Sequence, residues 1–114
     1  MWTIRPTDEY NKRVRAFRKK ASKAVFSLNR KLQSVKTVLE ASGNADQVNY
    51  AFFKKLRPRL HEIKSSVAGQ TPLRLYVFLQ KTTKTIHLLT IGDKRTQDAD
   101  IKAAHEAIKR IKEE

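Results

Sequence analysis

Two basic residues lie within segments that otherwise have the composition of buried strands. Lys64 and Arg74 each have large apolar neighbours along the chain. A charged side chain in such surroundings loses its hydration and costs free energy unless an anion compensates it. Glu62, on the same strand face as Lys64, is one source of that compensation. The alternative is that Lys64 and Arg74 form a positively charged surface that binds the phosphates of a ligand.

Two aromatic residues lie on the strand face of Arg74. Tyr76 and Phe78 follow it at intervals of two residues, so the three side chains leave an extended strand on the same side. Such a face suits the stacking of bases beside a cation that holds their phosphate. Packing in the core accounts for both aromatic side chains without any ligand. Both interpretations remain open at the level of sequence.

Familiar catalytic and cofactor motifs are missing from the sequence. The three glycines form no phosphate loop and no dinucleotide fingerprint. His61, His87 and His105 are scattered, without the spacing of a metal site, so we expect core or surface histidines. The chain has no cysteine, which excludes disulfides and thiolate chemistry and fits a reducing compartment. We therefore predict neither a metal nor a cofactor.

The net charge of this chain is unusually high for its size. The 114 residues include 25 Lys and Arg against 11 Asp and Glu, a balance of +14. A small domain is comfortable with a net charge of about 2–8. The excess lies entirely upstream of residue 93, because bases and acids balance over residues 93–114. This pattern predicts an anionic partner: nucleic acid, a membrane surface or an acidic protein.

The basic residues fall into two groups. One group lies on the N-terminal helical segment, where Glu40 is the single acid among ten bases. It forms either a solvated face or a binding surface, and its candidates for contact with a partner protein are Arg15, Lys19 and Lys23. The second group lies on the approach to the predicted strands and within them, and comprises Lys54, Lys55, Arg57, Arg59, Lys64 and Arg74.

The spacing of apolar residues in the first half predicts one strand followed by helices. A short strand is expected over residues 2–4, and apolar residues then recur every three or four positions from Tyr10 to Leu39. Because thirty residues is long for a helix in a small domain, we expect two helices that meet near Ser22 or over residues 27–29. Gly43 ends the second of them, and a short third helix is predicted between Asn44 and residue 58.

In the second half of the chain, the spacing of apolar residues changes from the helical pattern to patterns typical of strands. Strands are predicted over residues 60–65, 73–79 and 85–91, and a last helix over residues 98–112. The last two strands are apolar at nearly every position, which predicts interior strands covered on both faces. No apolar run is long enough to cross a bilayer, and the N-terminus lacks the apolar core of a signal peptide. We expect a single α+β domain over residues 1–114, located in the cytoplasm without membrane contact.

These segments carry a resemblance to a known family. The stretches Leu60-His-Glu-Ile-Lys64, Pro72-Leu-Arg-Leu-Tyr-Val-Phe78 and Ile86-His-Leu-Leu-Thr-Ile-Gly-Asp-Lys-Arg-Thr96 precede an alanine-rich helix. In order and spacing they resemble the RelE/ParE superfamily of bacterial toxin–antitoxin toxins, and within it the HigB-like (host inhibition of growth) branch. The likeness covers essentially the whole chain. It implies a small, twisted, mostly antiparallel sheet with two N-terminal helices, a short third helix and a C-terminal helix.

The resemblance also implies a function. Many members of the superfamily cut messenger RNA, often in the ribosomal A site, and each is neutralised by a cognate antitoxin protein. Lys64, Arg74 and either Lys94 or Arg95 match the basic positions that bind RNA phosphates and stabilise the cleavage transition state, and Arg95 is the candidate for catalysis. Lys64 is the first candidate for the general base, because Arg74 and partial burial would lower its pKa, and Glu62 is the second. Further contacts to RNA are expected from Lys94, Arg57, Arg59 and Tyr76.

Two departures and two alternatives accompany this expectation. Relatives that cut RNA commonly carry a Tyr, or an Asp/Tyr/His group, near or after the last helix, whereas this chain has Asp98 and Asp100 near the start of that helix. The chain could instead be a non-enzymatic basic module that binds RNA or protein, or a gyrase poison like some ParE members. If Arg74 is catalytic, its removal leaves stability nearly unchanged; if it pairs with Glu62, removal costs about 3–5 kcal/mol.

Overall fold

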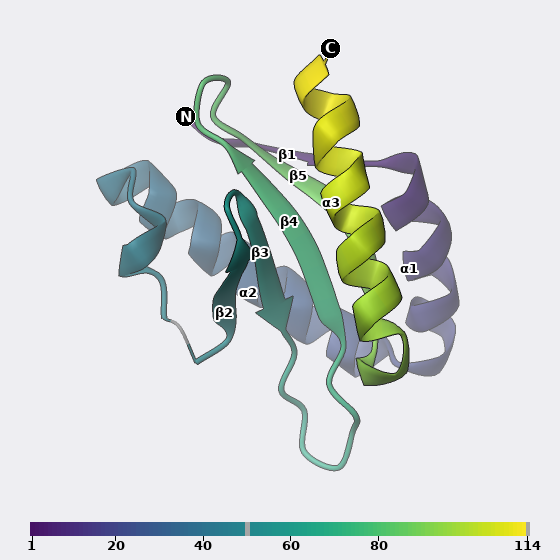
Figure 1. The fold of residues 1–114 in the computed structure, drawn as a ribbon. Coiled ribbons are helices and arrows are strands. Elements are labelled where there is room, and N and C mark those ends of the chain that lie inside the picture. The colour runs from purple at the N-terminus through teal and green to yellow at the C-terminus, as the bar shows by residue number, and fades with distance from the viewer. Residues whose placement is uncertain (50, 114) are drawn as a thin grey trace.

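The fold consists of one sheet between two layers of helices (Figure 1). The computed structural model describes residues 1–49 and 51–113 of the chain. The elements in chain order are β1 (Thr3–Pro6), α1 (Asp8–Lys20), α2 (Ser22–Ser42), the 3-10 helix η1 (Ala45–Gln47), β2 (Phe53–Arg57), β3 (Leu60–Lys64), β4 (Arg74–Gln80), β5 (Thr85–Gly92), the 3-10 helix η2 (Lys94–Thr96) and α3 (Gln97–Glu113). The predicted α+β class is confirmed.

The sheet is mixed, with the strand order β1-β5-β4-β3-β2. β1 runs parallel to β5, and the other neighbours are antiparallel. Helices α1 and α2 cover one face, while α3 packs against β4 and β5 on the other (Figure 1). β4 and β5 are therefore buried on both faces, as their apolar sequences predict. On the α3 side, Leu60 of β3 packs in the cluster under the helix, whereas the end of β3 at Lys64 is exposed.

Alternation along the strands divides the core into two layers. Side chains such as Ile63, Leu75 and Val77 point to the α1 and α2 side and form the larger cluster. The smaller cluster lies under α3 and consists of Leu60, Tyr76, Phe78, Leu89, Ala104 and Ile108. The packing interpretation of Tyr76 and Phe78 is thus confirmed, since both are buried in this second layer.

The break between the first two helices is confirmed at the first of the two predicted places. α1 ends at Lys20 and α2 begins at Ser22, with Ala21 between them in a non-helical conformation (φ −147°, ψ 48°). No Pro or Gly is needed for this break, because a stripe of buried residues on each helix packs on the sheet and fixes the turn between them. Gly43 then ends α2 with a left-handed φ of +68°, and its N–H donates to the Leu39 carbonyl.

The predicted third helix is wrong beyond its first turn. Asn44 caps η1 as expected, since its side-chain oxygen accepts a hydrogen bond from the Asp46 N–H at 2.9 Å. The chain then becomes extended, and β2 forms a hairpin with β3. Phe53 alternates with exposed Lys54 across the strand and pairs with Ile63. Long-range pairing with β3 therefore overrides the local helical spacing of apolar residues.

A buried polar network attaches α3 to the rest of the protein. Arg13 Nη1 donates to Asp100 Oδ1 at 2.5 Å and to Thr90 Oγ1 at 2.9 Å. Thr96 Oγ1 donates to the other oxygen of the same carboxylate at 2.6 Å. Asp100 is 4% exposed, so it is a structural residue that links α1, β5 and α3.

The network of Asp100 and Thr96 occupies the space that a side chain at position 92 would fill, so only glycine fits there. A Cβ at position 92 would lie 1.9 Å from Asp100 Oδ2 and 2.8 Å from Thr96 Oγ1. Gly92→Ala is therefore expected to lower the free energy of unfolding by about 2–3 kcal/mol, measured by urea denaturation. Gly69→Ala is the control, because its φ is +77° but no atom lies within 4 Å, and we expect a cost of about 1 kcal/mol. Equal costs would contradict the steric role of Gly92.

Among the described residues, none of the helices combines the length and the apolar character needed to cross a membrane.

Candidate active site on the basic sheet face

The strand register brings the sequence-predicted residues together on the α3 side of the sheet. Lys64 pairs with Arg74, and Glu62 pairs with Tyr76 on the next row. On the other flank of Glu62, β2 places Lys54 directly opposite it. Directly paired residues lie on the same face with their Cβ atoms about 5 Å apart. We call the exposed cations Lys54, Arg57 and Lys64, together with the Glu62–Arg74 pair, the basic sheet face.

The burial of the two cations differs from the prediction. Arg74 is 8% exposed, as expected, but Lys64 is exposed to solvent. The reason is its position, because Lys64 is the last residue of β3, beyond Leu60 and Glu62, the residues of this strand that contact α3 or the cluster beneath it. The loss of hydration on which its assignment as general base rests is therefore absent, and that part of the prediction is wrong.

Glu62 and Arg74 form a buried ion pair. Arg74 Nε lies 3.3 Å from Glu62 Oε1, and the two side chains are only 10% and 6% exposed. The atoms are not aligned as a hydrogen bond, and the buried Nε and Nη1 of Arg74 have no hydrogen-bond partner. Gln97, the first residue of α3, donates from Nε2 to Glu62 Oε1 at 3.2 Å. The carboxylate thus lies where the start of α3 meets β3 and β4.

Tyr76 adds a third polar group with no partner. Its hydroxyl is buried and makes no hydrogen bond. Burial raises the pKa of Tyr76 above its usual value, and the charge of Glu62 raises it further, so the phenol is neutral. Its ring lies beneath α3 at 0% exposure, where no base can stack on it. The prediction that Tyr76 contacts RNA is therefore wrong, because the strand lies in the interior of the sheet.

Lys94 and Arg95 lie in η2, immediately before α3, and both are exposed. Arg95 pairs with Asp93, with Nη2 3.1 Å from Oδ2, and its backbone N–H donates to Oδ1 at 3.0 Å. The hydrogen bond from the Arg95 side chain lowers the pKa of Asp93. Because Gln97 contacts Glu62, η2 lies at the same end of α3 as the ion pair. These two cations therefore lie near the basic sheet face, and their predicted roles in RNA binding and catalysis stay predictions.

Arg57 and Arg59 belong to the same hairpin but lie at different places on the surface. Both are exposed, and Arg57 lies opposite Leu60 on the α3 side of the sheet. Arg59 occupies the turn with a left-handed φ of +71° and lines a pocket with His61. His61 lies on the opposite face from Glu62, as strand alternation predicts. The structure thus keeps Arg57 near the basic sheet face and places Arg59 beside a different site.

Arg15, Lys19 and Lys23 are exposed on α1 and α2. These helices cover the sheet face opposite the ion pair (Figure 1). The structure therefore does not bring the three predicted partner contacts together with the basic sheet face.

Sequence reasoning missed two members of the site. Lys54 was assigned to a helix, and the alternation of Phe53, Lys54 and Lys55 along a paired strand is the signal that places it. Gln97 carries no signal of its own, since only the packing of α3 brings its amide to Glu62. Among the residues that the structure describes, no three His, Cys, Asp or Glu side chains form a group that could hold a metal ion.

Comparison of this chain with protein-family models, with curated proteins and with solved structures finds no match.

Proposed function

We propose that this protein is an endoribonuclease that cleaves messenger RNA on the basic sheet face, inhibits translation in the cytoplasm and is neutralised by an antitoxin protein. The observation that carries the proposal is the buried Glu62–Arg74 pair, whose guanidinium keeps two nitrogens without hydrogen-bond partners. A pair with a purely structural role is expected to be aligned, and often bidentate. Donors without a hydrogen-bond partner, close to the exposed cation Lys64, support a site that binds an anion.

The chemistry follows from the positions of these groups. The Glu62 carboxylate takes the proton from a ribose 2′-hydroxyl, whose oxygen attacks the adjacent phosphorus. The P–O2′ bond forms, the P–O5′ bond breaks, and the products are a 2′,3′-cyclic phosphate and a 5′-hydroxyl. Arg74 and Lys64 offset the negative charge that builds on the phosphate. The exposed Lys64 ammonium also protonates the leaving oxygen, so Lys64 acts as the acid and Glu62 as the base.

The remaining cations position the strand of RNA. Lys54 and Arg57 line one side of the ion pair, and Lys94 and Arg95 lie at the N-terminal end of α3. Phosphate contacts of this kind hold RNA in register without reading its sequence. Nucleotide preference must then come from other contacts, for example those made by the ribosome.

The toxin role rests on the resemblance to the HigB-like branch of the RelE/ParE superfamily. The α+β class and the paired N-terminal helices support it, as does the C-terminal helix over a mostly antiparallel sheet. The extended β2 in place of a third helix is a departure from the expected order. By the same resemblance the antitoxin is a cognate protein, and the exposed cations of α1 and α2 offer it an acidic-segment contact through Arg15, Lys19 and Lys23.

A non-enzymatic binding module is the second candidate. It is favoured by the low exposure of Glu62 and Arg74, since the accessible part of the basic sheet face consists of lysines and arginines. Such a surface binds phosphates without catalysing a reaction.

Induced expression without an antitoxin, followed by primer extension on cellular mRNA, tests the proposed function. We expect growth arrest and new cuts phased with codons, and no such cuts in uninduced cells. Growth arrest with intact mRNA and damaged DNA would replace the proposal by gyrase poisoning. Intact mRNA and intact DNA would replace it by the binding module.

A further inference from the structure

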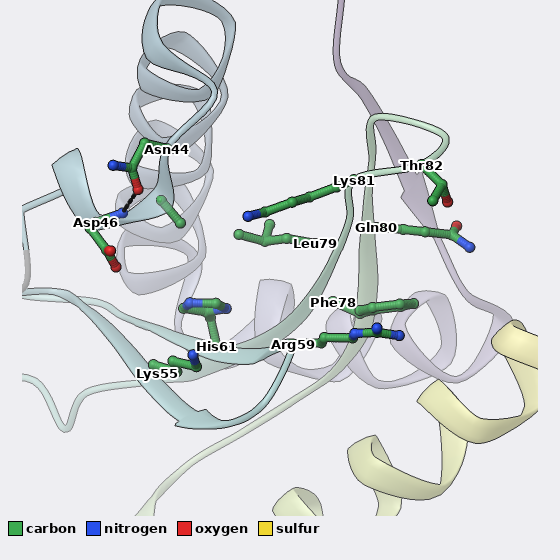
Figure 2. A pocket seen from close by; sticks show the side chains of 11 residues that line it. Asn44, Asp46, Lys55, Arg59, His61, Phe78, Leu79, Gln80, Lys81 and Thr82 are labelled. Atoms are coloured by element: carbon green, nitrogen blue, oxygen red, sulfur yellow. Dashed lines mark hydrogen bonds between the residues drawn. The ribbon is translucent and has the colours of Figure 1, made fainter.

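A pocket of about 430 Å³ lies at the end of the sheet between η1, the β2–β3 hairpin and the turn after β4 (Figure 2). Its size lies within the range that holds a small organic ligand. Three cations line it, namely Lys55, Arg59 and Lys81, against one acid, Asp46. His61 lies on the sheet face opposite Glu62, so the pocket is distinct from the basic sheet face.

His61 lines this pocket and has a buried nitrogen without a hydrogen-bond partner. It is 8% exposed, its ring stacks on Phe53 at 4.6 Å, and Nδ1 has no hydrogen-bond partner. Burial, and to a smaller extent the charge of Lys55, lower the pKa of His61 to about 4, so the ring is neutral at pH 7. Buried polar atoms are normally paired, and an exception in a pocket needs a reason. A ligand that supplies the missing partner is such a reason.

Arg59 provides an independent indication. Its φ of +71° is a conformation that glycine adopts freely and L side chains rarely adopt. A glycine would therefore suit this turn better than arginine if the turn were its only role. Arg59 instead places a guanidinium in the lining of the pocket, beside Phe78, and Lys55 and Lys81 line the same pocket at other places (Figure 2).

We propose that this pocket binds a nucleoside monophosphate. The three cations, Arg59 foremost, hold the phosphate, because a guanidinium matches phosphate oxygens in a bidentate way. The apolar side chain of Leu79, with the imidazole of His61, provides a surface for the base. Asn44 lines the same pocket, and its amide NH2 group can donate a hydrogen bond to the sugar or the base, while its oxygen accepts from the Asp46 N–H. The proposal stands independently of RNA cleavage on the opposite face.

Titration of the purified protein with AMP, followed by calorimetry, tests this site. We expect saturable binding with a dissociation constant below about 1 mM. Inorganic phosphate and adenosine, titrated separately, should each bind at least tenfold more weakly. Phosphate binding as tight as AMP would overturn the nucleotide class, and adenosine binding as tight as AMP would overturn the cationic site. Absence of saturable AMP binding would overturn the whole proposal.

Two matched variants distinguish AMP binding in the pocket from nonspecific attraction to the positive charge of the protein. Arg59→Gly relieves a left-handed residue and removes one cation from the pocket, so we expect a higher melting temperature and at least tenfold weaker AMP binding. Lys84→Gly relieves a φ of +51° and removes one cation from the next turn, outside the pocket lining. It should also raise the melting temperature and leave AMP binding unchanged. Unaltered binding by Arg59→Gly, or an equal loss in Lys84→Gly, would overturn the assignment.

The same phosphate chemistry occurs at the end of an RNA chain. Competition of AMP by an RNA hexamer with a 5′-phosphate, but not by the same hexamer without it, supports the site with RNA ends as its source. Displacement of AMP by neither hexamer supports the site with free nucleotide as its source. Displacement by both hexamers alike would show that the phosphomonoester is not recognised, and would overturn the proposal.

Discussion

Arg74→Ala is expected to lower the free energy of unfolding by about 3–5 kcal/mol, because Arg74 pairs with Glu62 in the structure and the nearly unchanged stability expected of an unpaired catalytic arginine does not apply. The substitution leaves Glu62, with a side chain only 6% exposed, without the cation beside it. Gln97 still donates one hydrogen bond to that carboxylate, but a neutral amide does not offset its charge. Urea denaturation followed by circular dichroism measures the loss.

Arg95→Ala is the control for this prediction. Its partner Asp93 is paired at a similar distance, yet the Arg95 side chain is 80% exposed. An exposed pair contributes about 0–1 kcal/mol, so the control should unfold almost like the wild type. If Arg74→Ala were as stable as Arg95→Ala, the burial of the Glu62–Arg74 pair would not contribute to the fold.

The helices and inner strands could be predicted because their signals are local. The buried stripe from Tyr10 to Leu39 has the helical period, and the apolar sequences of β4 and β5 match burial on both faces. The length of the helical segment also predicts a break, since a single thirty-residue helix would extend past a small sheet, but the place of the break at Ala21 depends on packing against the sheet. In each case the residues that decide the structure are neighbours along the chain.

The predictions from sequence fail where contacts between distant segments of the chain determine the structure. The spacing of Val48, Phe52 and Leu56 fits one face of a helix, and only pairing with β3 makes Phe53–Arg57 a strand. The exposure of Lys64 depends on how far α3 extends over the sheet. The sequence of β3 carries no information about this extent. The burial of Tyr76 follows from the same helix. The proximity of Glu62 and Arg74 was predictable from strand alternation, but the contact of Gln97 was not.

The second large effect concerns RNA cleavage. Replacement of the whole pair, Glu62→Leu with Arg74→Met, is expected to lower the cleavage rate about a thousandfold or more, because it removes the base and one charge-stabilising donor together. Stability should return to within about 1–2 kcal/mol of the wild type, since apolar side chains can replace a buried ion pair at little cost. RNA binding should persist, because Lys54, Arg57 and Lys64 are unchanged.

A matched control comes from an ion pair on α2. Lys36 Nζ lies 3.8 Å from Glu40 Oε1, with both side chains about a third exposed. The double replacement Lys36→Met with Glu40→Leu makes a similar chemical change, also without altering the net charge, away from the basic sheet face. It should leave both cleavage and RNA affinity at the wild-type level.

Single-turnover cleavage of a short RNA by the folded Glu62→Leu, Arg74→Met protein tests the proposed active site most directly. Circular dichroism first establishes that the variant is folded, and RNA binding is measured on the same sample. We predict a folded protein that binds RNA and does not cut it measurably, while the Lys36→Met, Glu40→Leu control cuts at the wild-type rate. A folded variant that cleaves at the wild-type rate would contradict the assignment of cleavage to Glu62 and Arg74.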